Sequence, residues 1–463
     1  MEVLPGKNPD LYCFCQTGRC KFQRPLFLQK FRISFGFYGR IFNVSVIKYL
    51  QKLTRGTLNL YLIQYTPYVI TLIFILLPAV LLGLQERNLN FYGLSGSFLL
   101  LLVVFGANPR QFFYLLGTFF WSMLLIRTAL LGRKNSAFRI WGFFLLLSAL
   151  LPVILKNFIL LHGQYLALYA ASACICLKTV QILSDIRKGR IREYPLGECA
   201  GFLLFFPSLF LGPLSNRRQF HDSWNCVPSA VKYRRMLLNG TQKLLEGILF
   251  LLFPVPVLSM MLPRLEEPIA GRGLLPHLLL LYGFLYGLRL FFFLAGFSHV
   301  AAGCACFLGV ELKKNFYLPF FSVSIRDFWN RWQITFICQL KELIFFPFMK
   351  VIRNAHAGTA VHCRAYSKKS RQISCPLFWK CIGYILTLGA LGILYGISSS
   401  TLLFAIYHGV LLCLSAVWEE KSPLHKKWNS LPAYRFVSWV LTMVLLSFGF
   451  SLLSGIFPGP FLS

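Results

Sequence analysis

The side chains best suited to chemistry lie in one stretch, 314–350, which reads KNFYLPFFSVSIRDFWNRWQITFICQLKELIFFPFMK. Among its aromatic residues it carries charged and amide side chains: Arg326, Asp327, Asn330, Arg331, Gln333, Lys341 and Glu342. Charges at membrane depth are costly, so such a segment in an apolar chain is a candidate functional site. The same pattern also describes an amphipathic helix on the bilayer surface. Both interpretations depend on the rest of the chain being a membrane protein.

The elements around this stretch are apolar runs. The chain has 463 residues, of which 56% are hydrophobic, and many runs approach the length of about 20 residues that crosses a bilayer. We expect spans at 68–84, 94–105, 112–131, 140–161, 165–183, 377–397, 401–417 and 433–456, a kinked span at 246–262, a long one at 274–309, and a re-entrant or interfacial hairpin at 201–220. The sequence therefore predicts an all-α, polytopic membrane protein with roughly ten to twelve membrane segments.

The charge is strongly basic, with 47 Lys and Arg against 15 Asp and Glu and a net charge of +32. Most of these charges lie between apolar runs, as expected for cytoplasmic loops that face anionic lipid headgroups. No basic soluble domain offers a surface for nucleic acid. We therefore expect membrane lipids, and no nucleic acid, as partners.

The domain division follows the same pattern. Residues 1–56 are basic and contain no apolar segment of the kind found in signal peptides. We expect them to form a cytoplasmic N-terminal extension before a multi-span membrane domain, 57–463.

Metal-binding and cofactor-binding patterns are absent from the sequence. The 14 Cys are scattered, and Cys13, Cys15 and Cys20 lack a second ligand pair at zinc-finger spacing. No HExxH motif occurs. We expect neither a metal nor a cofactor.

Three segments carry ordered motifs: FFPSLFLGPLSNRRQF at 205–220, a long segment at 290–336 that ends in SIRDFWNRWQITF, and LGILYGISSSTLLFAIYHG at 391–409. In this order they resemble the "FFP…GPI.R", "YFDFSGYSD…SI.DFW.RWH.T" and "GLWHG" segments of membrane-bound O-acyltransferases. The resemblance covers about 184–420. Within the family it is similar to the bacterial branch that includes the teichoic-acid D-alanyl transfer protein and alginate O-acetylation proteins.

The resemblance implies a helical ring around a central funnel through a bacterial inner or plasma membrane. It implies transfer of an acyl group from a thioester donor, on a carrier protein or CoA, to a hydroxyl of a cell-envelope polymer or lipid. An extracytoplasmic acyl-relay partner would also fit. A His acting as general base on the hydroxyl needs a neutral imidazole near pH 7.

This chain departs from the motifs at the imidazole positions. Tyr395 stands where the "WHG" His belongs, Gln333 replaces the His of "RWH", and Phe293 and His299 replace two Asp. His408 falls on the second His of the motif, 13 residues after Tyr395. A rival register makes Tyr407-His408-Gly409 the "WHG" itself. A phenol with a pKa near 10 and an amide that does not titrate are poor bases at pH 7.

The candidate catalytic residues are therefore His408, Tyr395 and Gln333, and the candidate substrate-binding residues are Asn315, Trp329, Asn330, Arg331, Trp332 and His299. Each has a simpler interpretation. The Trp pair suits helix packing, Arg331 and Asp327 suit an i,i+4 ion pair, and a lone His in an apolar helix is more often a core residue than a catalyst.

Three functions remain open on the sequence. The first is an acyltransferase whose base has moved, with His408 or His299 in that role. The second is a degenerate scaffold of the same family that binds a lipid, carrier or partner protein without transferring acyl groups. The third is a transporter, which explains the spans but not the three ordered motifs.

Overall fold

The computed structural model describes residues 70–106, 108–132, 148, 152, 166–209, 212–272, 275–363, 377–395 and 398–457. Contacts divide the chain into two units, Met1–Pro67 and Tyr68–Ser463. Only the second contains described residues, so the predicted extension 1–56 lies outside them. Everything below concerns the second unit.

Helices make up this unit, and no strand occurs in the described ranges, which confirms the all-α prediction. A helix at Ile70–Leu84 comes first. It is followed by α3 (Asn90–Phe105), α4 (Pro109–Gly132), α7 (Leu166–Arg187), α8 (Leu196–Leu204), α9 (Arg217–Asn225), α10 (Ala230–Leu252), α11 (Pro254–Arg272), α12 (Pro276–Phe307), α13 (Ile325–Arg331), α14 (Ile334–Leu340), α15 (Phe346–Cys363), α16 (Leu377–Tyr395), α17 (Ser399–Lys421), α18 (Pro423–Trp428) and α19 (Pro432–Ser454).

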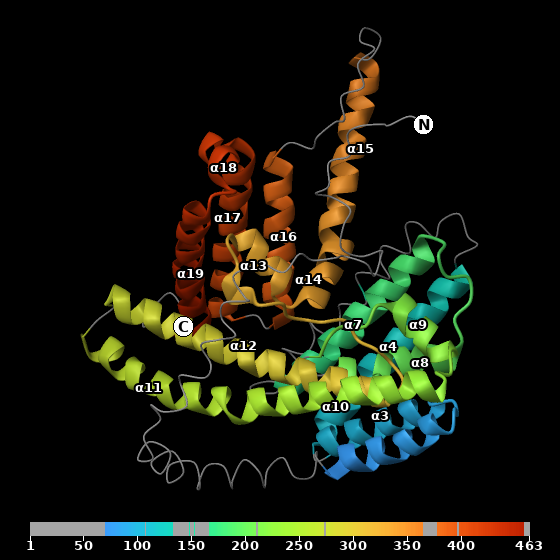
Figure 1. Cartoon of the computed structure of the whole chain (residues 1–463). Helices are drawn as coiled ribbons and strands as arrows, with labels where there is room; N and C mark the ends of the chain where they lie inside the picture. Colours follow the sequence, from blue (N-terminus) through green and yellow to red (C-terminus); the bar gives the residue numbers. More distant parts are fainter. Residues whose placement is uncertain are drawn as a thin grey trace, which may run out of the picture. The chain divides into compact units, whose positions relative to one another are not determined.

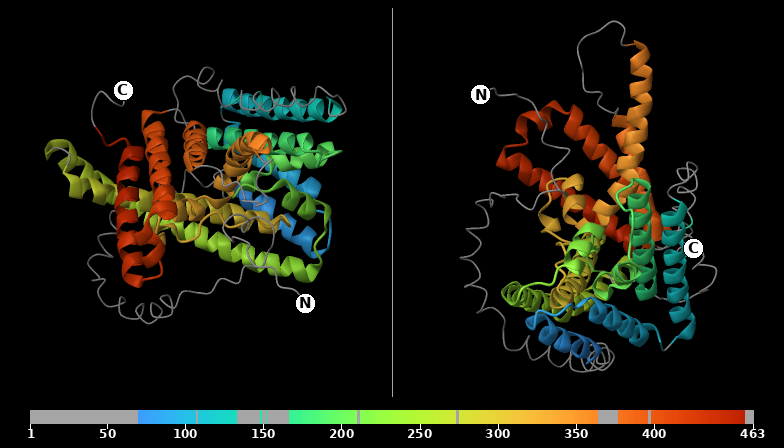
Figure 2. Two further views of the ribbon diagram at one scale, coloured as in Figure 1. Left: turned by 90° about the horizontal axis from the view of Figure 1, so that it is seen from above. Right: turned by 90° about the vertical axis from the view of Figure 1, so that its right-hand side faces the viewer.

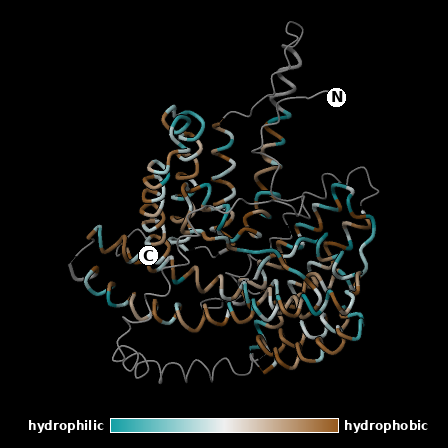
Figure 3. Tube along the Cα trace, viewed as in Figure 1, coloured by the Kyte–Doolittle hydropathy of each residue, from teal (hydrophilic) through white to brown (hydrophobic). Residues whose placement is uncertain are grey.

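Six helical segments among the described residues are long and apolar enough to cross a membrane: Pro109–Gly132, Ala230–Ile269, Pro276–Phe307, Leu377–Leu394, Ser399–Lys421 and Pro432–Ser454. Hydrophobic residues run along most of the long helices, whereas the short α18 is polar (Figure 3). The protein is a multi-pass membrane protein, as the composition predicted.

The predicted kink in the span around 246–262 is a break between two helices. α10 ends at Leu252 and α11 begins at Pro254. Proline has no N–H to donate to the preceding turn, and its ring clashes with the carbonyl four residues back, so one helix ends and the next begins there.

α10 lies along α12 (Figures 1 and 2), and glycines of both helices lie at their contact. A Cβ on Gly247 would lie 2.7 Å from the Gly296 carbonyl oxygen, and one on Gly303 would lie 2.8 Å from the Gly240 carbonyl oxygen. Any larger residue would push the two backbones apart. The glycines of 296–303 therefore permit the close helix approach expected from their spacing.

The stretch 314–350 is a series of short pieces rather than one surface helix. A 3₁₀ turn at Pro319–Phe321, α13, α14 and a π-helical turn at Lys341–Phe345 precede α15. Ser324 caps α13 by accepting a hydrogen bond from the Asp327 N–H at 3.1 Å. α13 packs against α17, so the predicted site region is a broken, partly buried segment beside a membrane helix.

Candidate functional site

His408 is enclosed by aromatic rings. It lies on α17 with 0% of its surface exposed. Its ring centroid is 4.4 Å from that of Phe404, 5.3 Å from Tyr407 and 5.4 Å from Trp329. Neither ring nitrogen has a hydrogen-bond partner. In this conformation the imidazole cannot meet a substrate, and it fills a space between helices.

α19 closes the remaining side of this aromatic enclosure. A Cβ on Gly449 would overlap Nε2 of His408 and would lie 3.1 Å from Cε1 of Tyr407. The absence of a side chain at Gly449 is therefore what makes room for the imidazole. The enclosure joins three separate parts of the chain: α13, α17 and α19.

Two contacts fix α13 against α17. Trp329 is buried beside His408, and its indole N–H has no hydrogen-bond partner. Nearby, Nη1 of Arg326 lies 2.7 Å from Oε2 of Glu419 on α17. The tryptophan packing and the ion pair together set where the SIRDFWNRW motif lies.

Trp332 and Arg331 both take the simpler roles that the sequence allowed. The Trp332 ring packs 5.2 Å from Phe328 and 5.3 Å from Phe316, between centroids, in the core. Nε of Arg331 donates to Oδ1 of Asp327 at 2.7 Å, which confirms the i,i+4 ion pair. A substrate-binding role for either residue stays a prediction.

Asn315 joins the motif segments. Its Nδ2 donates to Ser298 Oγ at 3.1 Å, its Oδ1 accepts from Thr335 Oγ1 at 2.9 Å, and its carbonyl accepts from the Ile334 N–H at 2.7 Å. Thr335 Oγ1 in turn accepts from the Leu214 N–H at 3.0 Å. This buried network connects α12, the start of α14 and the segment that follows the FFP motif.

The other candidates have different environments. Gln333 is buried with a left-handed backbone, φ 42° and ψ 52°, at the start of α14. Asn330 is exposed and accepts from Nζ of Lys341 at 2.8 Å. Tyr395 is the last residue of α16, and its side chain lies outside the described residues. His299 on α12 places Nδ1 2.9 Å from Oε2 of Glu246 on α10.

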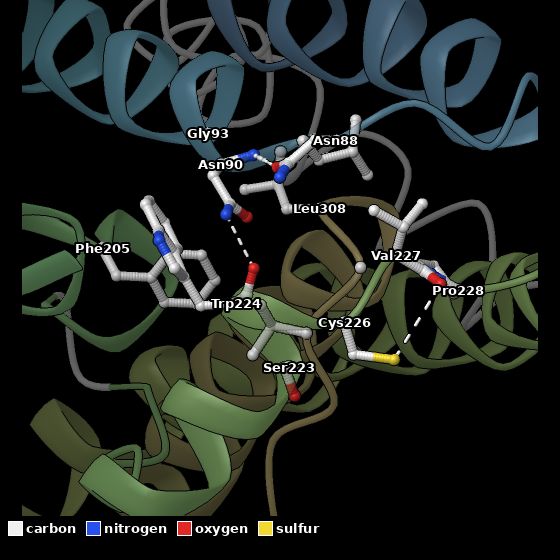
Figure 4. A pocket seen from close by; sticks show the side chains of 13 residues that line it. Asn88, Asn90, Gly93, Phe205, Ser223, Trp224, Cys226, Val227, Pro228 and Leu308 are labelled. Atoms are coloured by element: carbon white, nitrogen blue, oxygen red, sulfur yellow. Dashed lines mark hydrogen bonds between the residues drawn. The ribbon is translucent and has the colours of Figure 1, made fainter. Parts of the chain in front are cut away.

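A small pocket lies elsewhere, between the turn before α3, the end of α9 and residues 308–310 (Figure 4). Its volume is about 20 Å³, which is room for roughly one water molecule. Asn90 Nδ2 donates to the Trp224 carbonyl in its wall at 2.7 Å. None of the candidate residues lines it.

A charged cluster where α7, α8 and α9 meet was not predicted from the sequence. The Asp185 carboxylate receives Arg217 Nε and Arg190 Nη1, both at 3.1 Å. Oε1 of Glu198 lies 2.7 Å from Nδ1 of His221. The available signal was weak: a Glu in the first turn of a helix and a His four residues after an Arg. Only the folded chain pairs them.

The thiol beside this cluster is not an accessible nucleophile. Burial, together with the neighbouring Glu198 carboxylate, raises the pKa of Cys199 to about 12. Since the thiolate is the reactive form, Cys199 is inert at neutral pH. The chemistry available in the cluster therefore belongs to the imidazole and the carboxylates.

Comparison with known proteins extends the motif resemblance to nearly the whole chain. The teichoic acid D-alanyltransferase of Bacillus subtilis is 27% identical over 409 residues, which cover 84% of this chain and 98% of that protein. The teichoic acid D-alanyltransferase of Streptococcus thermophilus is 26% identical over 363 residues, covering 76% and 83%. Both matches support the resemblance to membrane-bound O-acyltransferases that the motifs carry.

A second group of relatives is matched over a shorter region. A probable alginate O-acetylase of Pseudomonas syringae is 24% identical over 202 residues, which cover 43% of this chain and 37% of that protein. No family model matches the sequence. The chain thus keeps the order of the motif segments, but its residues 333 and 395 are Gln and Tyr.

Proposed function

We propose that the protein transfers an acyl group from a thioester donor to a hydroxyl group of a cell-envelope polymer. The observation that carries this proposal is the similarity to a teichoic acid D-alanyltransferase over 98% of that protein's length. The Asn315 network supports it, because its hydrogen bonds hold segments of two of the ordered motifs together.

The reaction needs a proton acceptor. The acceptor hydroxyl attacks the thioester carbonyl, a C–O bond forms, the C–S bond breaks, and the thiol leaves with a proton. A general base that takes the hydroxyl proton contributes roughly 10²–10⁴-fold to such a step. Neither Gln333 nor Tyr395 is an imidazole, and His408 is sealed from solvent. The base must therefore lie elsewhere or reach the substrate in another conformation.

The same observations favour one second candidate, a scaffold of the family that binds donor or acceptor without transferring the acyl group. It is favoured because both aligned imidazole positions are changed and the one aligned imidazole that remains has no accessible nitrogen. On this reading, the Gln333→His/Tyr395→His double variant acquires a transfer activity that the natural chain lacks.

The test uses the full chain purified into lipid nanodiscs. Two labelled donors, acetyl-CoA and a D-alanyl carrier-protein thioester, are offered with teichoic acid as acceptor, and ester-linked label is counted. Transfer by the natural chain supports the acyltransferase. Absence of transfer with either donor, together with activity in the double variant, refutes it in favour of the scaffold.

His408 provides an internal check within this assay. If His408→Ala transfers at the natural rate in correctly folded protein, the imidazole has only a packing role. Loss of transfer with an unchanged thermal midpoint would mean that the enclosure opens during turnover.

A further inference from the structure

The pair formed by His221 and Glu198 combines a buried carboxylate with an open imidazole. Nδ1 of His221 lies 2.7 Å from Oε1 of Glu198, and the two side chains are 49% and 4% exposed. Glu198 lies in the first turn of α8, where the helix dipole stabilises a negative charge. The carboxylate is held inside the protein while the ring it orients reaches solvent.

The carboxylate partner favours one tautomer of the ring. A carboxylate only accepts hydrogen bonds, so Nδ1 of the neutral imidazole carries the hydrogen. Asn225, whose Nδ2 lies 3.0 Å from the same nitrogen, donates to the His221 carbonyl, also at 3.0 Å. Nε2 therefore keeps its lone pair and is free to accept a proton, as in the base of a carboxylate–histidine pair.

Simple docking of α9 does not require this arrangement. One turn earlier on the same helix, Arg217 already ties α9 to Asp185 of α7, and those side chains are only 10% and 11% exposed. A second anchor of the same kind would be expected to be buried at both ends. The half-exposed ring of His221 is instead placed where a substrate can reach it.

The surface around the ring is polar. Arg218, Asp222 and Asn225 are exposed, and Arg218 and Asn225, three residues before and four residues after His221, share its face of α9. Such a face offers hydrogen-bond donors and a positive charge to a hydroxyl-rich acceptor. Four other histidines whose side chains the structure describes have different settings: His408 is sealed, His277 is exposed on α12, His299 pairs with an exposed carboxylate, and His425 contacts the Tyr434 hydroxyl.

We propose that His221, oriented by Glu198, is the general base of this chain. The inference rests on the acyl transfer proposed above. Nε2 takes the proton of the acceptor hydroxyl as its oxygen forms the new bond to the acyl carbon. The C–S bond of the donor breaks, and the imidazolium returns the proton to the departing thiolate. Glu198 is a positioning residue that holds the tautomer and stabilises the imidazolium.

The experiment compares variants of the full chain in the nanodisc transfer assay. His221→Asn keeps a polar group at the position of Nδ1 and removes Nε2, and it is expected to lower the rate by about 10²-fold or more. Glu198→Gln keeps an acceptor but loses the charge, and it is expected to lower the rate by about tenfold or more. His425→Asn is the matched control and should retain the natural rate, because Nδ1 of its ring meets the Tyr434 hydroxyl rather than a carboxylate.

Rescue of the transfer rate by added imidazole distinguishes a catalytic role of His221 from a structural one. Added imidazole should restore part of the rate of His221→Ala and leave Glu198→Gln unchanged, a result that a purely structural ion pair cannot produce. If the natural chain transfers and His221→Asn is equally fast, the base assignment fails and acyl transfer stands. If His221→Asn is slow but imidazole does not rescue His221→Ala, the pair is structural and the assignment also fails. If the natural chain transfers no acyl group, the proposed function fails, and the assignment of His221 as its general base fails as well.

Discussion

Gly449 lies so close to the His408 ring that the substitution Gly449→Ala should destabilise the protein. The added Cβ would overlap Nε2 of His408 and would lie 3.3 Å from its Cδ2 and 3.1 Å from Cε1 of Tyr407. The imidazole cannot swing away, because the Phe404 and Trp329 rings pack against it at 4.4 and 5.4 Å. α19 must therefore move away from α17, or the rings must leave their rotamers.

The magnitude follows from two opposing terms. Overpacking a well-filled site costs about 1–3 kcal/mol, while replacing Gly by Ala inside a helix contributes up to about 1 kcal/mol of stability. We expect a net loss of about 1–2 kcal/mol, measured as a lower thermal unfolding midpoint in detergent. The matched control is Gly389→Ala on α16, where an added Cβ meets nothing within 4 Å, and it should be neutral or stabilising.

A double variant tests the cause. In a His408→Ala background the overlapping ring is gone, so Gly449→Ala should cost less than about 0.5 kcal/mol, and the two effects should be strongly non-additive. The reasoning about the enclosure is refuted if Gly449→Ala is as stable as Gly389→Ala. It is equally refuted if the two substitutions are additive.

Three further predictions concern the motif segments. Asn315→Ala should lower stability by about 1–3 kcal/mol, because buried partners lose their hydrogen bonds; an unchanged unfolding midpoint would contradict this. Arg326→Gln and Glu419→Gln should each cost less than about 1 kcal/mol, because the pair is partly exposed. The double variant should cost no more than one of them, and additivity in a thermal double-mutant cycle would exclude the ion pair. Leu318 has a left-handed backbone with φ 45°, so the Leu318→Gly variant should be about 1 kcal/mol more stable than Leu318→Ala. Equal unfolding midpoints of the two variants would show that this backbone is unstrained.

Much of the fold could be predicted because membrane spans are encoded locally. In a bilayer each backbone group must be satisfied within its own helix, so apolar length predicts helices directly. The helices at 276–307, 399–421 and 432–454, and the break before Pro254, match expectations for this reason. The Arg331–Asp327 pair could also be predicted, because its partners are one helical turn apart.

The stretch 314–350 shows where such reasoning stops. One of the two interpretations of its residues was a single surface helix, yet Leu318 and Gln333 have left-handed backbones that divide it into short pieces. These conformations disagree with the local preference of Leu and Gln. Next to them, two backbone hydrogen bonds join separate parts of the stretch: Tyr317 N–H donates to the Arg331 carbonyl, and Ile334 N–H donates to the Asn315 carbonyl. Neither periodicity nor motif order contains those contacts.

The sequence by itself determined the class of the protein: the number of basic and apolar residues, the order of the motifs, and the Gln and Tyr at positions 333 and 395. Tertiary structure decided which histidine is available. It sealed His408 between α13, α17 and α19 and left the His221 ring open against Glu198. The physical reason is that the exposure and the pairing of a side chain depend on which helices pack together. Glu198 and His221 are 23 positions apart in the chain, and Trp329 and His408 are 79 apart, so each pair meets only after folding.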